Sequence, residues 1–136
     1  MPQVEPRNPS VALQGTVLVI DDDDIVRTVI GRMLERAGFH VLTAEDGLAG
    51  IAAFREHLTT VQAVILDMTM PRMDGVETCR SLRELSPGVK VILSSGYAQR
   101  DAVVQLPALA VAGYLQKPYA ADELLALLHS VIATAV

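Results

Sequence analysis

Hydrophobic and polar residues alternate along this chain in two kinds of block. Short apolar runs rich in β-branched side chains are separated by longer segments in which apolar residues recur every three or four positions. The short runs are typical of strands buried on both faces, and the longer segments are typical of helices with one buried stripe. The expected strands cover residues 16–20, 40–44, 63–66, 89–93 and 111–116.

The segments between these strands predict helices. The spacing of apolar residues from Ile25 to Ala37 predicts one buried stripe, and Gly38 supplies a residue that commonly ends a helix. A second helix is expected over 47–58, with these residues facing inward: Leu48, Ile51, Ala52 and Phe54. The remaining helices are expected over 76–85, 100–106 and 121–133.

The alternation of strand and helix defines the expected fold class. Strands joined through helices of about ten residues run parallel, with right-handed crossovers that place helices on both faces of the sheet. The chain is therefore predicted to form a doubly wound α/β domain over residues 15–136. Residues 1–14, which carry prolines among polar residues, are expected to form a flexible tail or linker.

Composition narrows the class of protein. Of the 136 residues, 51% are hydrophobic and 20% are charged, as expected for a globular domain. We expect a cytoplasmic protein, because the sequence has no bilayer-length apolar run, no signal-peptide pattern and a single cysteine, Cys79. The net charge of −5 and the lack of a basic cluster argue against direct nucleic-acid binding, and no membrane contact is expected.

Charged residues gather where three of the predicted strands end. Asp21 and Asp22 follow the first strand, Asp67 follows the third, and Lys117 follows the fifth. Ligands of an open parallel sheet bind at the carboxyl ends of its strands, so these groups are expected at one site. Three carboxylates repel one another unless a cation lies between them, and a ligand set made only of oxygen suits Mg²⁺.

A carboxylate in such a site is also able to accept a phosphoryl group. An aspartate nucleophile forms an aspartyl phosphate, and the transfer needs mainly positioning and neutralisation of charge. In this hypothesis Asp67 is the nucleophile, while Mg²⁺ and Lys117 supply positive charge. The Ser95 hydroxyl, near the end of the fourth predicted strand, supplies a hydrogen-bond donor.

Four motifs at the predicted strand ends carry a resemblance to a known family. They are VLVIDDD at 17–23, VILDMTMPRMDG at 64–75, VILSSG at 91–96 and GYLQKP at 113–118. With these motifs in this order, the chain resembles the response-regulator receiver domain of two-component signal transduction over residues 16–132. The resemblance implies a flavodoxin-like fold of five βα units, with a parallel sheet in the order 2-1-3-4-5.

The resemblance assigns a role to each acidic residue at the strand ends. It implies that Asp67 is the phosphoacceptor and that Asp22 binds Mg²⁺ directly. Asp21 would hold the ion partly through water, and Asp67 and the Thr69 backbone carbonyl would complete its protein ligands. Thr69 and Tyr97 are expected to limit the access of water to the phosphate.

The resemblance also implies a conformational switch. Lys117 would pair with Asp67 and later with the phosphate. Ser95 would be the switch hydroxyl, and the Tyr114 ring would change its rotamer with it. The Lys117–Pro118 peptide bond is expected to be cis, which the chemistry of a bond before proline permits.

The implied function is that of a phosphoacceptor in a two-component phosphorelay. A histidine kinase or a histidine phosphotransfer protein donates the phosphoryl group. The domain has no conventional turnover, but it would catalyse its own phosphorylation and a slow autodephosphorylation. The phosphate would shift a surface formed by the fourth helix, fifth strand and fifth helix, which binds a downstream protein or a second copy of the domain.

Alternative interpretations remain open at the level of the whole protein. The chain is either a stand-alone receiver or a receiver module from a hybrid sensor histidine kinase, which the SSGY and YLQKPY segments favour. A receiver that is not phosphorylated and serves only as a binding module is a further alternative. A phosphatase with an aspartyl-phosphate intermediate is disfavoured, because it typically needs a second carboxylate where this chain has Thr69.

Other chemically suggestive residues have simpler expected roles. Asp23 and Asp24 are expected to cap the first helix and to interact with its dipole. Asp74 and Gly75 are expected to form a turn. Cys79 lies on the apolar stripe of its helix and is expected in the core. The histidines are isolated in the sequence and are expected to be surface or core residues: His40, His57 and His129.

Overall fold

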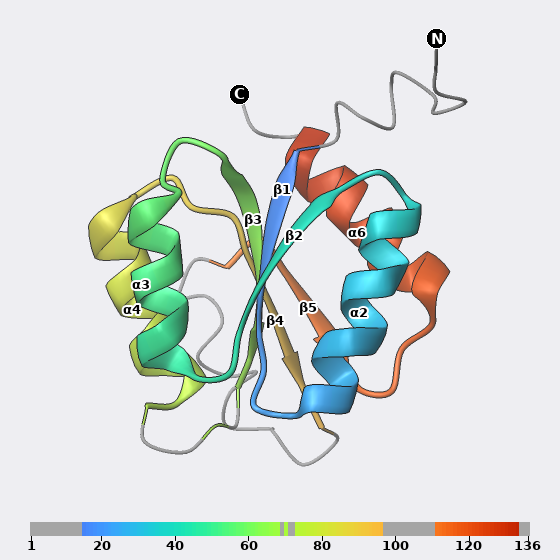
Figure 1. Cartoon of the computed structure of the whole chain (residues 1–136), viewed down its shortest axis with the longest axis horizontal. Coiled ribbons are helices and arrows are strands. Elements are labelled where there is room, and N and C mark those ends of the chain that lie inside the picture. Colours follow the sequence, from blue (N-terminus) through green and yellow to red (C-terminus); the bar gives the residue numbers. More distant parts are fainter. Residues whose placement is uncertain (1–14, 69, 71–72, 97–110, 134–136) are drawn as a thin grey trace, which may run out of the picture.

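The computed structural model describes residues 15–68, 70, 73–96 and 111–133. Its helices and strands are β1 (Thr16–Ile20), α2 (Asp24–Arg36), β2 (His40–Ala44), α3 (Gly47–Glu56), β3 (Val61–Asp67), α4 (Gly75–Leu85), β4 (Val91–Ser95), β5 (Gly113–Gln116) and α6 (Ala121–Ala133). Strands and helices follow one another as the hydrophobic pattern predicted (Figure 1). The helix expected over 100–106 lies outside the described residues.

The five strands form one parallel sheet in the order β2-β1-β3-β4-β5, which confirms the expected topology. Figure 1 shows α2 and α6 on one face of the sheet and α3 and α4 on the other. Side chains alternate between these faces along each strand. In β1, Val17 and Val19 join the apolar cluster under α2 and α6, whereas Leu18 and Ile20 join the cluster under α3 and α4.

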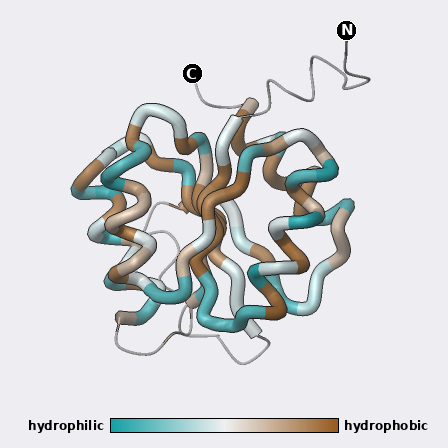
Figure 2. The backbone as a smooth tube through the Cα atoms, viewed as in Figure 1, coloured by the Kyte–Doolittle hydropathy of each residue, from teal (hydrophilic) through white to brown (hydrophobic). Residues whose placement is uncertain are grey.

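The core therefore has two apolar layers, one on each face of the sheet. The side chains of β1 from Val17 to Ile20 are fully buried, as the continuous apolar run predicted. Figure 2 shows the most hydrophobic residues concentrated along the central strands, with hydrophilic residues on the outer surfaces of the helices. Within the described ranges, no helix is both long enough and apolar enough to cross a membrane.

Helix α2 departs in part from the predicted buried stripe. Ile30 and Leu34 are buried as expected, but Ile25 and Val29 are 74% and 45% exposed. The apolar stripe is thus wider than the surface that the sheet and α6 cover. Gly38, with φ of 96°, lies in the left-handed region just after the helix, which confirms its expected role in ending it.

Helix α3 presents a different face to the sheet from the one predicted. Phe54 is buried and Ile51 is half-buried, but Leu48 and Ala52 are exposed, so their inward placement was wrong. Gly50 faces inward instead and lets the helix approach β1 closely. A pattern of apolar residues does not reveal this face, because glycine contributes no side chain to the pattern.

The contact between Gly50 and β1 gives a stability prediction. A Cβ at position 50 would lie 2.3 Å from Cδ1 of Ile20, whose side chain is fully buried. Overpacking costs about 1–3 kcal/mol, and the higher helix propensity of alanine offsets up to about 1 kcal/mol of it. Gly50→Ala is therefore expected to lower the free energy of unfolding by about 1 kcal/mol, measured by urea denaturation.

The matched control for this substitution is Gly88→Ala. A Cβ at Gly88 meets nothing within 4 Å, so the free energy of unfolding should change by less than about 0.5 kcal/mol. Equal stability of the two variants would contradict the close helix–strand contact.

The strand boundaries differ from the predicted ones in three places that matter for the site. Strand β3 covers Val61–Asp67 rather than 63–66, so Asp67 ends the strand instead of following it. Strand β4 covers Val91–Ser95 rather than 89–93, and β5 begins at Gly113 rather than at 111. The register pairs Ser94 with Asp67 of β3 and Ser95 with Gln116 of β5. Both serines are therefore held inside the sheet and not in a loop after it.

Candidate functional site

Asp21 and Asp67 lie at the carboxyl edge of the sheet on neighbouring strands. Asp67 is the last residue of β3, and Asp21 directly follows β1, which pairs with β3. Both residues are buried, with 2% and 6% of their surface exposed. The Asp21 N–H donates to the Ala44 carbonyl at 3.1 Å, and the Arg27 side chain donates to the Asp21 carbonyl at 2.6 Å. These bonds fix the acidic segment on both sides.

The structure brings Asp21, Asp22 and Asp67 together, as the strand-end argument predicted. One carboxylate oxygen from each residue lies within 4.8 Å of the others. Asp22 is exposed, so the cluster opens to solvent on its side. A hard-oxygen donor set with two buried carboxylates fits Mg²⁺, whose charge would offset their mutual repulsion.

Lys117, which directly follows β5, places its ammonium group between the two buried carboxylates. Nζ donates to Oδ2 of Asp21 at 2.9 Å and lies 3.5 Å from Oδ1 of Asp67. Burial disfavours the charged form, but the hydrogen bond to Asp21 and the negative charges of Asp67 and Asp21 outweigh it and raise the pKa of Lys117. Lys117 is therefore positively charged at neutral pH. Its contact with Asp21 is shorter than its contact with Asp67.

Ser95 and Tyr114 meet on the α3–α4 face of the sheet. The Ser95 Oγ and the Tyr114 hydroxyl oxygen lie 2.6 Å apart, within hydrogen-bond distance, and Ser95 is fully buried. Tyr114 is half-buried and packs against the apolar cluster on this face. The two residues that the resemblance linked as a switch are thus in direct contact, with the ring turned toward the serine.

Several other sequence expectations have a clear outcome. The Asp23 carboxylate accepts hydrogen bonds from the N–H groups of Ile25 and Val26, which confirms its capping role. Asp24, at the start of the helix, forms an ion pair with Arg27. The Lys117–Pro118 bond is cis, as expected.

The segment after β3 also follows the expected chemistry. Asp74 forms a capping box with Glu77 at the start of α4, so it is a helix cap rather than part of a turn alone. Cys79 is fully buried, and burial raises the pKa of its thiol, which makes it an unreactive core residue. His57 is half-buried, with its ring Nδ1 3.0 Å from the Ala53 carbonyl oxygen. His40 and His129 are exposed.

Two expected roles fall on residues that the structure does not describe. Thr69, proposed as a carbonyl ligand of the metal, and Tyr97, proposed to limit water access, both lie outside the described ranges. Their roles stay predictions from the resemblance.

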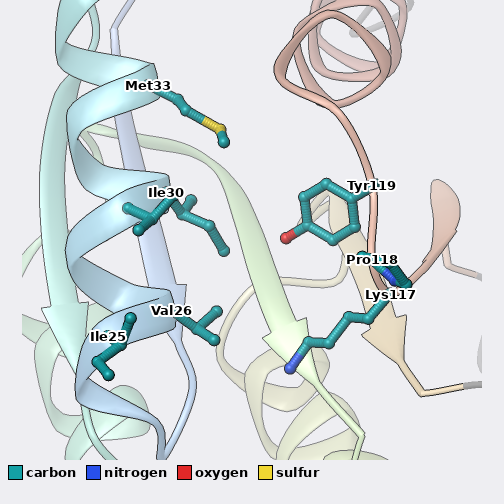
Figure 3. Close-up of a pocket in the computed structure, with 8 residues that line it drawn as sticks. Ile25, Val26, Ile30, Met33, Lys117, Pro118 and Tyr119 are labelled. Carbon is teal, nitrogen blue, oxygen red and sulfur yellow. The ribbon is translucent and has the colours of Figure 1, made fainter.

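Sequence reasoning missed two hydroxyl groups beside the site, those of Ser94 and Tyr119. Both oxygens are buried. Figure 3 shows the Tyr119 ring extending from the β5–α6 connection toward α2, next to the Lys117 side chain. A signal was present in the sequence, because each hydroxyl residue lies within two positions of a predicted site residue. Ser94 directly precedes Ser95, and Tyr119 follows Lys117 by two positions.

Fold and site together define a doubly wound α/β domain with an acidic, lysine-bearing site at the carboxyl edge of its sheet. Residues 17–129 match the family described as the response regulator receiver domain. The chain belongs to this family, and its fold is the flavodoxin-like fold that the resemblance implied. Domains of this family generally bind Mg²⁺ at an acidic pocket and interact with histidine kinases and downstream effectors.

Individual relatives support this membership. The chain is 36% identical over 122 residues to the transcriptional regulatory protein CseB of Streptomyces avermitilis, covering 90% of this chain and 51% of CseB. It is 37% identical over 110 residues to the sensor kinase CckA of Brucella abortus, covering 81% of this chain and 12% of CckA. The chain thus spans about half the length of CseB and a small part of CckA.

A solved structure supports the fold as well. The response regulator receiver domain protein from Clostridium thermocellum superposes with a TM-score of 0.84 at 30% identity, covering 88% of this chain and 94% of that protein. The chain is therefore a receiver domain of the two-component type.

Proposed function

We propose that Asp67 is the phosphoacceptor of this receiver domain and that Mg²⁺ bound at Asp21, Asp22 and Asp67 is required for the transfer. The observation that supports this most directly is the convergence of the three carboxylates, with the Lys117 ammonium group 3.5 Å from Asp67. Asp67 ends the strand at the centre of the sheet, whereas both oxygens of the Asp21 carboxylate already accept close hydrogen bonds, one from the Asp23 N–H and one from Lys117. It is therefore the carboxylate best placed to act as a nucleophile.

The proposed reaction is an in-line phosphoryl transfer from a phosphohistidine. A carboxylate oxygen of Asp67 attacks phosphorus, the P–N bond breaks, and its electron pair returns to the histidine ring nitrogen. Asp21, Asp22, Asp67 and, in the family pattern, the Thr69 carbonyl would hold Mg²⁺, which would supply positive charge to the phosphoryl oxygens. Lys117 is already held at the site by Asp21 and requires only a small movement to contact the new phosphate.

The Ser95–Tyr114 contact is proposed as the switch that reports the phosphate. A phosphate on Asp67 would compete with Tyr114 for the Ser95 hydroxyl, since that hydroxyl is 2.6 Å from Tyr114 and lies on the neighbouring strand. The changed contact would shift a surface that includes β5 and α6, which binds a downstream protein or a second copy. The predicted fourth helix of that surface lies outside the described residues.

The central experiment is direct phosphorylation by a small phosphodonor. The protein is incubated with acetyl phosphate and Mg²⁺, the acyl phosphate is trapped by borohydride reduction, and the modified residue is located by mass spectrometry. Modification at Asp67 is expected, and chelation of Mg²⁺ should abolish it. Saturable beryllofluoride binding, followed by ¹⁹F NMR, is an independent measure. A protein that neither labels nor binds beryllofluoride would be a binding module and not a phosphoacceptor.

The phosphodonor protein is proposed to dock on the exposed apolar part of α2. Ile25 and Val29 line a groove with Lys117 and Pro118, so an apolar surface lies next to the cation of the site (Figure 3). A partner that covers Ile25 would bring its phosphohistidine to Asp67 with water excluded from around it. This is the physical reason for a large exposed isoleucine at this position.

A charge at position 25 should separate docking from chemistry. Ile25→Glu is expected to lower the rate of phosphotransfer from a histidine phosphotransfer protein at least about tenfold, as at a central interface residue. Labelling by acetyl phosphate, which needs no docking, should change less than about twofold. Leu48→Glu is the matched control, because Leu48 is also exposed but lies on α3 across the sheet. Equal loss with both donors would place Ile25 in the chemistry and contradict the docking role.

The whole protein that carries this domain is proposed to be either a response regulator or a hybrid sensor kinase. Similarity to part of CseB favours the first, and similarity to a short part of CckA favours the second. The neighbouring coding sequence distinguishes them, because an adjoining kinase or effector region would reveal the context. Phosphotransfer profiling against candidate kinases would then identify the cognate donor.

A further inference from the structure

Ser94 and Tyr119 carry two buried hydroxyl groups beside the lysine of the site. Neither oxygen makes a direct hydrogen bond within the described part of the chain, although both are shielded from solvent. A buried hydroxyl without a partner is costly, and such groups in native proteins nearly always have one. Two such hydroxyls near each other therefore suggest that they interact with each other.

The fold brings these two side chains to the same side of the sheet. Ser95 faces Tyr114 on the α3–α4 side, so the alternation of β4 turns the preceding Ser94 toward the α2–α6 side. The Tyr119 ring packs in the apolar cluster on that side. The Ser94 hydroxyl is close enough to affect the Tyr119 phenol, since it favours the ionised form of that phenol.

Electrostatics keep the Tyr119 hydroxyl protonated. Burial, and after it the negative charges of Asp21 and Asp67, raise the pKa of Tyr119 to about 12. The phenol is therefore protonated throughout the physiological range and is available as a donor. Ser94, only 1% exposed, has a hydroxyl that both donates and accepts, so the two groups are able to share a hydrogen bond in either direction.

Ser94 lies on β4, between β3, which ends in Asp67, and β5, which is followed by Lys117. It pairs with Asp67 in the sheet register, and its carbonyl accepts a hydrogen bond from the Met68 N–H at 2.9 Å. The next carbonyl, that of Ser95, accepts from the Lys117 N–H at 2.7 Å. Tyr119, two residues after Lys117, is half-buried in the apolar cluster on the α2–α6 side, which is the side that Ser94 faces.

We propose that the Tyr119 and Ser94 hydroxyls are linked through one bridging water, or directly after a small side-chain rotation, and that this pair positions Lys117 over Asp21 and Asp67. The pair connects Tyr119, two residues after Lys117, to Ser94, which pairs with Asp67 in the sheet. It thereby limits the lysine segment to one arrangement relative to the acceptor. This role deepens the proposed phosphoacceptor function and rests on it, and Tyr119 is a positioning residue because it does not contact the phosphoryl group.

Tyr119→Phe, Ser94→Ala and the double variant test the pair, with Ser130→Ala, on the exposed face of α6, as the control. Each single test variant should lower the initial rate of Asp67 phosphorylation by acetyl phosphate about 3- to 10-fold, the worth of one hydrogen bond. The double variant should be no slower than the slower single variant, because both remove the same interaction. The control should phosphorylate like the wild type.

The chain offers a spectroscopic measure that general destabilisation would not reproduce. Lys90 and Lys117 are its only lysines, so their side-chain NMR signals are readily assigned. Tyr119→Phe and Ser94→Ala should both shift and sharpen the Lys117 signal, which reports a freer ammonium group, and leave the Lys90 signal unchanged. Thermal unfolding, measured alongside, shows that the variants remain folded at the assay temperature.

The outcomes separate this proposal from the phosphoacceptor assignment. Wild-type rates in the variants, additive losses in the double variant, or slower rates with an unchanged Lys117 signal would each overturn the positioning role. A wild-type protein that is not phosphorylated at Asp67 would overturn the proposed function. In that case the Lys117 signal would still test whether the hydroxyl pair holds the lysine.

Discussion

Asp67→Asn is expected to reduce phosphorylation by acetyl phosphate to background, a loss of more than about a thousandfold, because the nucleophilic oxygen is replaced by an amide nitrogen or a weakly nucleophilic amide oxygen. The variant should fold normally. Asp67 is buried within 4.8 Å of two other carboxylates, so removal of its charge relieves repulsion with Asp21. Quantitative mass spectrometry of the trapped acyl phosphate measures the effect.

The matched control for this substitution is Asp74→Asn, which makes the same chemical change a few residues later. Asp74 is exposed and caps α4, and asparagine is an equally good cap, so both labelling and stability should be retained. Undiminished labelling of Asp67→Asn, mapped to another carboxylate such as Asp21, would show that the acceptor has been assigned to the wrong residue.

Lys117→Met is expected to lower the rate of phosphoryl transfer about 10²- to 10³-fold, the usual consequence of removing one charged donor from a transition state. Methionine retains most of the aliphatic stem, so packing beside Pro118 and Tyr119 is largely preserved. The variant should still bind Mg²⁺, and should bind it more tightly, because the ammonium group no longer competes for Asp21 and Asp67. Rates at saturating Mg²⁺ separate the loss of chemistry from any change in metal affinity.

The same variant should also make stability depend on Mg²⁺. Without Lys117, both buried carboxylates lose the ammonium group that lies within ion-pair distance of each, and thermal stability should fall in the presence of a chelator and recover with Mg²⁺. Lys90→Met, the same change away from the site, is the control and should show neither effect. A Lys117→Met protein with a wild-type transfer rate would refute a role for the ammonium group in the reaction.

The pKa of Lys117 predicts how the wild-type rate depends on pH. Because the folded protein raises this pKa above the ordinary value of 10.5, the stabilising charge is fully present below that value and is lost only as the pH rises above it. Lys117 deprotonation should therefore cause no loss of rate up to about pH 9.

The hydrophobic pattern was sufficient for the architecture of the domain. The continuous apolar runs, such as Val17 to Ile20, correctly predicted strands buried on both faces. The acidic and basic residues at the strand ends were correctly expected to meet, because parallel strands place their carboxyl ends at one edge. Strand order came from the family resemblance, since periodicity alone does not determine which strands are neighbours.

The same pattern was a poor guide to helix faces and to local register. It placed Ile25 and Val29 in the core, although α6, which follows them by about a hundred residues, covers only the later turns of α2. It also gave Gly50 no weight, although close contact with Ile20 decides the orientation of α3. In both cases the error arises because the residues that pack against the helix are distant in the sequence, so the local pattern does not show them.

The opposite orientations of Ser94 and Ser95 separate what the sequence determines from what the tertiary structure determines. The sequence by itself determined that hydroxyl groups stand near the end of the fourth strand and that a lysine and a tyrosine follow the fifth. Only the tertiary structure decided that Ser95 meets Tyr114 on one face while Ser94 lies on the other face, where the Tyr119 ring packs. The physical reason is that a shift of one residue in strand register exchanges the two faces, and register is set by pairing with distant strands.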